Sequence, residues 1–367
     1  KYASISVFYM SENHPSNLKL QYDDSLVSND FSTTLGALIL GFVFLVGVPG
    51  NLFIVWSILA RIRRHSVTTF LILNLACADG FLMALTLFFV IYLAKQSWVF
   101  GIVMCKGVFY LCNTNMYASI FLITLMSLHR LVAVLLPTKV SLIASPRIAK
   151  RVVVGMWALV FIISIPSLVF RNIRIDEDEM GKPRMVCVPN HTLVRFQYAF
   201  ETVSGFILPY AVIITSYVLI LRRLRQTQFR KKVRSEKLIL AIVVTFGIFW
   251  LPYHVINMIQ VFNSLNMYRL SSSLDHIWQS SRAVTSALAF ISSCANPVLY
   301  TFAGKSYIRQ NGFAFMARLL EGTSLDQGTK KGRSPNSELI QDKQTQELDS
   351  KSQQIKHILP LKRQRHS

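Results

Sequence analysis

Long apolar runs separated by short polar connections dominate this chain of 367 residues. A helix that crosses a membrane needs roughly 20 mostly apolar residues. Seven runs reach that length, and they predict spanning helices near 34–61, 69–94, 102–136, 148–170, 196–224, 235–262 and 277–303. The third and fifth runs are longer than a bilayer is thick, so both helices should project into the cytoplasm. The pattern predicts an all-α membrane protein with a seven-transmembrane helix bundle.

The segments outside this bundle differ in composition. Residues 1–33 are polar and lack the continuous apolar core of a cleavable signal, so we expect an extracellular segment. The bundle should occupy residues 34–304. Apolar and basic positions alternate over residues 305–320, which predicts a short amphipathic helix at the membrane interface. Residues 321–367 are rich in Ser, Thr, Gln, Lys and Asp, a composition typical of a disordered tail.

The charge of the chain is distributed unevenly. A net charge of +21 would suggest nucleic acid as a partner if the protein were soluble, but 52% of the residues are hydrophobic. Basic residues gather in alternate connections, near 61–64, 139–151 and 222–234, whereas the acidic run Asp176–Glu179 lies in a connection between them. The positive-inside rule places the basic connections in the cytoplasm. We therefore expect a multi-pass protein of the plasma membrane, with its N-terminus outside, its C-terminus inside and no nucleic-acid partner.

Two of the five cysteines lie on the outer side of this topology. Cys105 begins the third run and Cys187 lies in the longest outward connection, so both face an oxidising compartment. We predict a disulfide between them that pins this connection over the mouth of the bundle. The same connection contains Asn190-His191-Thr192, a glycosylation sequon. The other cysteines lie in apolar runs and are interpreted as small buried residues: Cys77, Cys112 and Cys294.

Polar residues at membrane depth are costly and usually functional. Asp79 lies inside the second run. One interpretation is a structural network with Asn51 and Asn296 that joins three helices. The other adds a small hard cation such as sodium, because Asp79, Ser119, Ser292 and Asn296 offer oxygen ligands. Both interpretations remain open at this point.

Prolines interrupt the last two runs. Pro252 follows Trp250 in the sixth run, and Pro297 lies in the segment that ends at Tyr300 in the seventh. A proline removes a backbone hydrogen bond and kinks a helix, and in a membrane the freed carbonyl needs another partner. We expect these four residues to form a switch that changes how the helices pack.

A basic residue stands at the inner end of the third run. Arg130 is followed by apolar residues, so it is either a charge that reaches to the interface or a functional group. Tyr217 in the fifth run and Tyr300 in the seventh should lie at the same cytoplasmic side. Three polar side chains that converge there predict a docking crevice for a helix of a partner protein.

The order and spacing of these residues resemble the rhodopsin-like G-protein-coupled receptors over about residues 34–320. The matching positions are Asn51, Asp79, Cys105, Arg130, Trp157, Trp250, Pro252 and Asn296–Tyr300. His129 departs from the family, which usually has an acid before the arginine, and Phe249 stands where a cysteine is usual. The resemblance implies a receptor, not an enzyme, whose helices repack on ligand binding and favour nucleotide exchange on a heterotrimeric G protein.

Within that family the chain resembles the leukotriene B4 receptors in particular. The stretches that carry this resemblance are Met116–Ser119, Phe200–Phe206, Trp250–Asn257, Arg282 with Ala287–Phe290, and Leu319–Thr323. The resemblance implies a chemoattractant receptor for an oxygenated fatty acid, leukotriene B4 above all, and coupling mainly to inhibitory G proteins.

Charged residues in the outer half support an anionic lipid ligand independently. Glu201 is an ionisable group inside a span, so it should face the interior of the bundle and have a partner there. Arg171 ends the fourth run and Arg282 begins the seventh, and an arginine fork suits a carboxylate. The alternative is an internal salt bridge between Glu201 and one arginine, with no role in binding.

Further ligand contacts are predicted next to these charges. His254 and Asn257 could bind hydroxyl groups of an acyl chain together with Glu201, although a lone histidine is as often a packing residue. Four further residues could supply apolar walls: Phe109, Tyr110, Met116 and Phe206.

Other functions are tested against the same residues. A receptor for a basic chemoattractant peptide would use the acidic run Asp176–Glu179, and a scavenging receptor with weak G-protein activation is suggested by His129. A transporter would need paired discontinuous helices, which the pattern lacks. The sequence contains no metal-site spacing, no phosphate-binding glycine loop and no nucleophile elbow. It also has no lysine between Trp278 and Phe302, which removes a retinal protein.

The tail carries candidate phosphorylation sites in flexible polar sequence: Thr323, Ser324, Thr329, Ser334 and Ser337. Each phosphate adds about −1.5 to −2 charges, enough to reverse a locally basic stretch. We therefore expect receptor kinases and arrestin as cytoplasmic partners.

Overall fold

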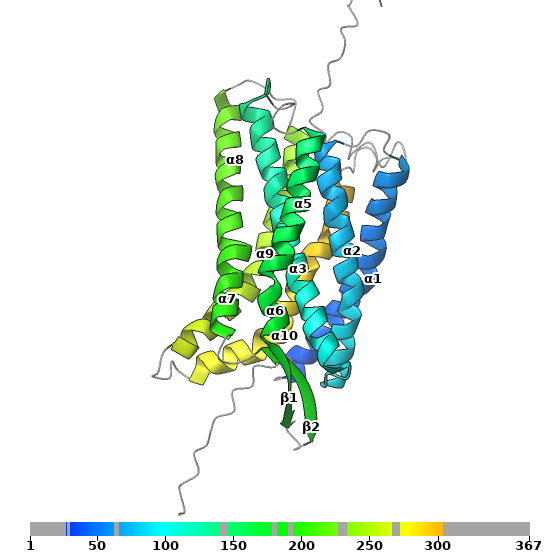
Figure 1. Ribbon diagram of the computed structural model, residues 1–367, viewed down its shortest axis with the longest axis vertical. Coiled ribbons are helices and arrows are strands. Elements are labelled where there is room, and N and C mark those ends of the chain that lie inside the picture. Colours follow the sequence, from blue (N-terminus) through cyan, green and yellow to red (C-terminus); the bar gives the residue numbers. More distant parts are fainter. Residues whose placement is uncertain are drawn as a thin grey trace, which may run out of the picture. The chain divides into compact units, whose positions relative to one another are not determined.

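The computed structural model describes residue 27 and residues 30–61, 66–139, 145–177, 182–189, 194–226, 233–265 and 272–303. Long helices run side by side through the bundle, as Figure 1 shows. The long helices are α1 (Asp30–Arg61), α2 (Val67–Lys95), α3 (Gly101–Leu135), α5 (Pro146–Ile163), α8 (Leu208–Gln226), α9 (Val233–Leu265) and α10 (Ser272–Ala303). The shorter elements are α6 (Ile165–Val169), β1 (Arg171–Glu177), β2 (Pro183–Pro189), α7 (Val194–Thr202) and the π-helical turn η1 (Val203–Ile207).

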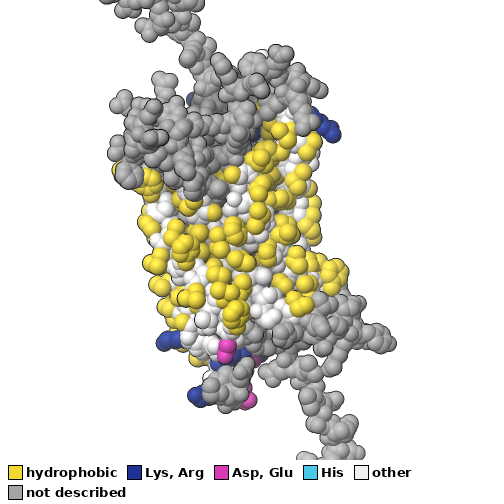
Figure 2. Space-filling model, turned by 180° about the vertical axis from the view of Figure 1, so that it is seen from behind, with side chains coloured by type: hydrophobic (Ala, Val, Ile, Leu, Met, Phe, Trp, Pro, Cys, Tyr) yellow, Lys and Arg dark blue, Asp and Glu magenta, His cyan; other side chains and the backbone are white. Residues whose placement is uncertain are grey.

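Helix lengths and apolar surfaces confirm the predicted fold class. Within the described residues, 6 helical segments are long and apolar enough to cross a membrane, and α10 is a further long helix. Large apolar side chains point outward, among them Leu45, Val154 and Ile162, which are 71%, 69% and 62% exposed. Figure 2 shows such side chains along the flank of the helices, with charged ones near the ends. In water this surface would be unfavourable, whereas it matches lipid tails.

The predicted helix boundaries differ from the structure mainly in the seventh, fourth and fifth runs. The seventh helix begins at Ser272 and not near 277. The fourth run, expected as one helix over 148–170, is divided at Ser164 into α5 and α6, because Pro166 has no backbone N–H. The Ser164 hydroxyl donates to the carbonyl of Val160 at 2.8 Å, so this carbonyl at the break has a hydrogen-bond partner.

The fifth run was likewise expected as one helix over 196–224. It consists of α7, η1 and α8, with the π-helical turn just before Pro209. Pro209 cannot donate to the carbonyl four residues back, so the local hydrogen bonding shifts there. Gly205 lies in this turn, where an added Cβ would be 2.9 Å from Met116 Cε. The bulge therefore lets the fifth span pack closely on α3.

Two glycines let α1 approach its neighbours. A Cβ on Gly47 would lie 2.7 Å from the Met83 side chain of α2, and one on Gly50 would lie 3.0 Å from Pro297 Cγ of α10. One residue later, the Asn51 amide donates to the carbonyls of Gly47 at 3.0 Å and Ser293 at 3.2 Å. The side chain of Asn51 thus links α1 to the backbone of α10.

The outward connection after the fourth span is a β-hairpin, which the sequence analysis treated as a loop. β1 and β2 are antiparallel, with Ile173 opposite Cys187. The predicted disulfide is confirmed: Cys187 is bonded to Cys105 at the start of α3. The Trp98 backbone N–H also donates to the carbonyl of Met185 at 2.7 Å. These contacts hold the hairpin against the outer ends of α2 and α3.

Several predictions lie outside the described residues. They are the N-terminal segment over most of 1–33, the amphipathic helix at 305–320, the tail at 321–367 and the glycosylation site Asn190. The switch residue Tyr300 lies in α10, but its side chain is not described.

Candidate functional site

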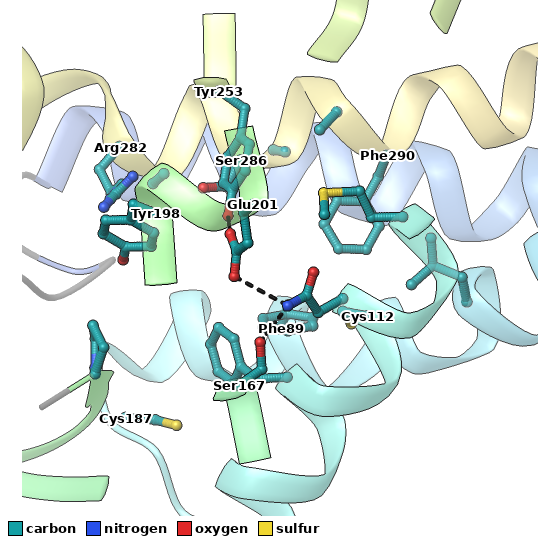
Figure 3. A pocket seen from close by; sticks show the side chains of 18 of the residues that line it. Phe89, Cys112, Ser167, Cys187, Tyr198, Glu201, Tyr253, Arg282, Ser286 and Phe290 are labelled. Atoms are coloured by element: carbon teal, nitrogen blue, oxygen red, sulfur yellow. Dashed lines mark hydrogen bonds between the residues drawn. The ribbon is translucent and has the colours of Figure 1, made fainter. Parts of the chain in front are cut away.

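A pocket opens between the outer halves of the helices, and Cys187 of β2 forms part of its wall (Figure 3). Its cavity volume is about 110 Å³. Apolar and aromatic side chains form most of the wall, including Phe89, Phe109, Met116, Trp250 and Phe290. The polar side chains in the wall are Asn113, Ser167, Arg171, Gln197, Tyr198, Glu201, Tyr253, Arg282 and Ser286.

Helical periodicity decides which residues reach this wall. On α3 the lining residues Phe109, Cys112, Asn113 and Met116 follow the spacing i, i+3, i+4 and i+7, and on α10 Arg282, Ser286 and Phe290 are spaced by four. Residues at this spacing share one face of a helix. Each side of the pocket is therefore a single stripe of a longer helix.

Glu201 is held by neutral donors. Its Oε1 accepts hydrogen bonds from the amides of Asn113 at 3.0 Å and Gln197 at 2.8 Å, and its Oε2 accepts one from the Tyr253 hydroxyl at 3.2 Å. The residue is 3% exposed. Dashed lines in Figure 3 mark hydrogen bonds of this cluster. Within the described part of the chain Glu201 makes no salt bridge, so the internal ion pair considered from the sequence does not form there.

Arg171 lies at the outer end of the pocket, at the start of β1. Its guanidinium carbon is 3.6 Å from the centroid of the Phe109 ring, and Nη1 donates to the carbonyl of Cys187 at 3.3 Å. Nε is buried and has no hydrogen-bond partner among the described residues. Burial lowers the pKa of this guanidinium, because loss of water destabilises its charge. An anion in the pocket would restore that stabilisation.

Arg282 has stronger partners than Arg171. Nη1 donates to the side-chain oxygen of Asn257 at 2.5 Å, and Nη2 donates to that of Gln260. The guanidinium also lies over the Tyr198 ring, 4.7 Å from its centroid. Two amide oxygens already orient this cation, so Arg282 is held in place by α9 whereas Arg171 keeps donor capacity for a ligand.

Four predicted ligand residues, Phe206 among them, do not line the pocket. The Tyr110 hydroxyl donates to the carbonyl of Phe161 at 3.1 Å, outside the wall. His254 is next to Tyr253 and hence rotated away from the lining face of α9; its Nδ1 is 3.2 Å from Thr202 Oγ1. Asn257 binds Arg282 from behind. A direct role for these side chains in ligand binding stays a prediction, whereas Phe109, Arg171, Glu201 and Arg282 all line the pocket.

Sequence reasoning missed Asn113, Gln197 and Tyr253, which complete the Glu201 cluster. A signal was present for two of them. Asn113 is a polar side chain inside the third apolar run, and Gln197 precedes Glu201 by four positions, one helical turn.

The predicted inner polar network is partly assembled. Asp79 is fully buried, and its carboxylate accepts hydrogen bonds from Ser119 Oγ at 3.1 Å and Asn296 Nδ2 at 2.7 Å. Ser292 does not bind Asp79 but accepts a hydrogen bond from the Trp250 indole at 2.9 Å. Since Trp250 also lines the pocket, this bond links the pocket to α10 one turn before Pro297.

The predicted cytoplasmic crevice is described in part. Arg130 is buried, at 4% exposure, near the inner end of α3. Tyr217 on α8 packs against the main hydrophobic core. Because the side chain of Tyr300 is not described, the convergence of the three groups stays a prediction.

The fold and these sites agree with those of a known receptor family, which the sequence matches. The 7 transmembrane receptor (rhodopsin family) pattern matches residues 50–300, and the chain belongs to this family of G-protein-coupled receptors. It is therefore a multi-pass membrane receptor of a class that acts through heterotrimeric G proteins, and not an enzyme.

Two kinds of leukotriene B4 receptor are similar to the chain. Leukotriene B4 receptor 1 of Homo sapiens is 39% identical over 310 residues, which cover 83% of this chain and 87% of that protein. Leukotriene B4 receptor 2 of Mus musculus is 34% identical over 327 residues, covering 86% and 88%. The type-1 angiotensin II receptor A of Xenopus laevis is 29% identical over 272 residues, covering 72% and 75%.

Proposed function

We propose that this receptor binds an oxygenated fatty-acid chemoattractant, leukotriene B4, at the plasma membrane, and signals mainly through inhibitory G proteins. Its N-terminus would lie outside the cell and its C-terminus inside, where receptor kinases and arrestin would act on the tail. The observation that carries the ligand class is the buried Arg171 guanidinium with an unpartnered Nε at the outer end of an apolar pocket. The names of the similar receptors support the particular lipid.

The chemistry of the wall suits such a ligand. A carboxylate would pair with Arg171 at the outer end. The acyl chain would run along Phe89, Phe290 and Trp250, and its hydroxyl groups would exchange hydrogen bonds with the Glu201 cluster. Pockets for drug-sized ligands have volumes of roughly 300–1,000 Å³, whereas this cavity is about 110 Å³. Binding therefore requires side chains or helices to move apart, which couples the ligand to helix packing.

The test is competition against radiolabelled leukotriene B4 on membranes that contain the full chain. The free acid should displace the label, its methyl ester should do so at least about tenfold more weakly, since it lacks the ionic hydrogen bond, and basic peptides should not. Nucleotide exchange on purified G proteins of each class, measured on the same membranes, should be greatest for the inhibitory class. Displacement by peptides, or binding without any exchange, would favour the peptide or scavenging alternatives.

The peptide alternative has lost part of its support. It relied on an acidic run, yet both carboxylate oxygens of Asp176 accept hydrogen bonds from Arg174, at 2.6 and 2.8 Å. Asp176 is also buried, at 6% exposure. This carboxylate is therefore engaged within the hairpin and cannot attract a basic peptide without breaking that pair.

We also propose that Asp79 binds a sodium ion. The carboxylate of Asp79 and the hydroxyl oxygen of Ser119, 3.1 Å apart, fit this ion, and no arginine or lysine pairs with this carboxylate in the described residues. A bound cation would stabilise the buried charge. When present, the ion would hold α2, α3 and α10 in the arrangement seen here.

Replacing Asp79 with asparagine should abolish the effect of sodium on agonist affinity. In the wild type, agonist binding should weaken several-fold when potassium is replaced by sodium at constant ionic strength; in Asp79→Asn it should not change. Ser57→Ala on α1, another buried polar residue, serves as the control and should keep the sodium effect. A sodium effect that persists in Asp79→Asn would place the ion elsewhere.

A further inference from the structure

Tyr210 on α8 makes an unusual contact with the backbone of α9. Its hydroxyl donates to the carbonyl of Val243 at 2.5 Å, and the backbone N–H of Gly247 lies against the oxygen of that hydroxyl. In a regular helix that N–H would donate to that carbonyl, four residues back. The tyrosine hydroxyl therefore lies at a rung of the α9 hydrogen-bond ladder, a position where helices bend.

Gly247 makes this approach possible. An ideal Cβ on Gly247 would lie 2.7 Å from Tyr210 Cζ, which is far inside van der Waals contact. Gly155 on α5 is different, because an added Cβ there meets no atom within 4 Å. A side chain at position 247 would thus push the tyrosine ring out of its seat, whereas the same change at position 155 would not disturb a neighbour.

The Tyr210 ring also continues a row of aromatic side chains. It stacks on Phe206, with centroids 5.1 Å apart, and Phe206 stacks on His254 with centroids 4.7 Å apart. His254 in turn is 6.0 Å from Trp250, which lines the pocket. The row begins with Trp250 and His254 on α9 and continues through Phe206 and Tyr210 of the fifth span. The Tyr210 hydroxyl then contacts α9 again, at the carbonyl of Val243.

Pro252 lies between these two points of contact. His254 is on its outer side, and Val243 and Gly247 are on its inner side. A proline inside a helix removes one backbone hydrogen bond and makes a bend. We propose that Phe206 and Tyr210 form a brace across this bend, and that Tyr210 positions the inner half of α9 in the resting receptor.

The small volume of the pocket indicates that the brace belongs to the resting, ligand-free conformation. The cavity is too small for a ligand of the usual size, so the arrangement seen here has to change when a ligand enters. Movement of Trp250 or His254 would shift Phe206. The Tyr210 ring, which stacks on Phe206 and packs against Gly247, would shift with it. The brace would then release the carbonyl of Val243 and let the inner half of α9 turn about Pro252.

The test uses Tyr210→Phe and Gly247→Ala in the full chain. Tyr210→Phe keeps the ring stack and removes the hydrogen bond, so ligand-independent nucleotide exchange per receptor should rise roughly twofold to tenfold. Gly247→Ala should also raise exchange, because the added methyl group would overlap the Tyr210 side chain and displace its hydroxyl from the carbonyl of Val243. The double variant should add little to either change, since both remove one contact.

A second measurement needs neither ligand nor G protein. Spin labels at exposed Leu221 on α8 and Leu240 on α9, in a chain that also carries Cys77→Ser, report the distance between the two helices. The wild type should give one main distance, and each brace variant should add a second one. This readout depends on the receptor class but not on the proposed ligand, so the two ideas can fail separately.

Matched controls separate positioning from general stability. Gly155→Ala makes the same change in open space, and Thr215→Val removes a hydroxyl of α8 that binds only its own helix, at the carbonyl of Ala211. Both controls should leave exchange and the distance distribution unchanged. If Tyr210→Phe and Gly247→Ala behave like these controls in both measurements, the brace does not position α9. Lower thermal stability with unchanged exchange would likewise contradict it.

Discussion

Arg171→Ala is expected to weaken binding of leukotriene B4 by about 10-fold to 150-fold, which corresponds to the loss of one ionic hydrogen-bonded contact of about 1.5–3 kcal/mol. The guanidinium lies over Phe109 at the outer end of the pocket and keeps an unpartnered Nε. Truncation removes the positive charge and leaves the ligand carboxylate without its partner. Saturation binding on membranes with equal receptor density would measure the change.

Arg282→Ala provides the matched comparison. This arginine also lines the pocket, but Asn257 and Gln260 already accept its hydrogen bonds. Each variant should be assayed with the free acid and with the methyl ester of the lipid. Arg171→Ala should lose most of the preference for the acid, whereas Arg282→Ala should keep it even if its affinity falls. An intact preference in Arg171→Ala would assign the carboxylate to another group, and unchanged affinity in both variants would remove the ionic contact altogether.

The fold could be predicted from the sequence because the signal is strong and local. Each span needs a long apolar run, and the lipid requires every backbone group to be bonded within the helix. The breaks at Ser164 and around Val203–Ile207 were missed, although Pro166 and Pro209 mark them. A proline shows where a hydrogen bond is lost, but neighbouring helices decide whether the chain kinks, breaks or forms a π-helical turn.

The candidate site was predictable only in part. Charged groups inside a span must face the interior, which correctly indicated that Glu201 points inward, where it lines the pocket. Neutral polar residues carry no such requirement. His254 and Tyr253 are neighbours in sequence, yet only Tyr253 reaches the wall, because one residue is a rotation of about 100° on a helix. That choice depends on how α9 is rotated against α8 and α10, and the sequence alone does not determine it.

The partners of the buried charges were equally hard to predict. Glu201 was expected to pair with an arginine or a ligand, and it accepts hydrogen bonds from Asn113, Gln197 and Tyr253. Three neutral donors can stabilise a carboxylate without cancelling its charge. The arrangement depends on three helices that meet at one height, which is a tertiary property.

Loss of the disulfide should have the largest effect on stability. The cysteines are separated by 82 positions, and closing a loop of that size stabilises a folded chain by about 4.5 kcal/mol in the loop-entropy model. Cys105→Ser and Cys187→Ser should therefore each lower surface expression strongly, and the double variant should be no worse than either. Cys77, which was expected to be buried, is instead an exposed free thiol on the outward face of α2, and Cys77→Ser should behave like the wild type. Losses that add in the double variant would show that each cysteine acts alone.

The same variants should also lose ligand binding in the receptors that still reach the surface. Cys187 lies in β2, and its carbonyl accepts the hydrogen bond of Arg171 Nη1. Arg171 lies opposite Pro189 in the hairpin register, and both residues line the pocket. A hairpin freed from α3 would move this wall together with the guanidinium. Binding per surface receptor should thus fall by at least as much as in Arg171→Ala, and normal binding per receptor would show that the hairpin keeps its place without the disulfide.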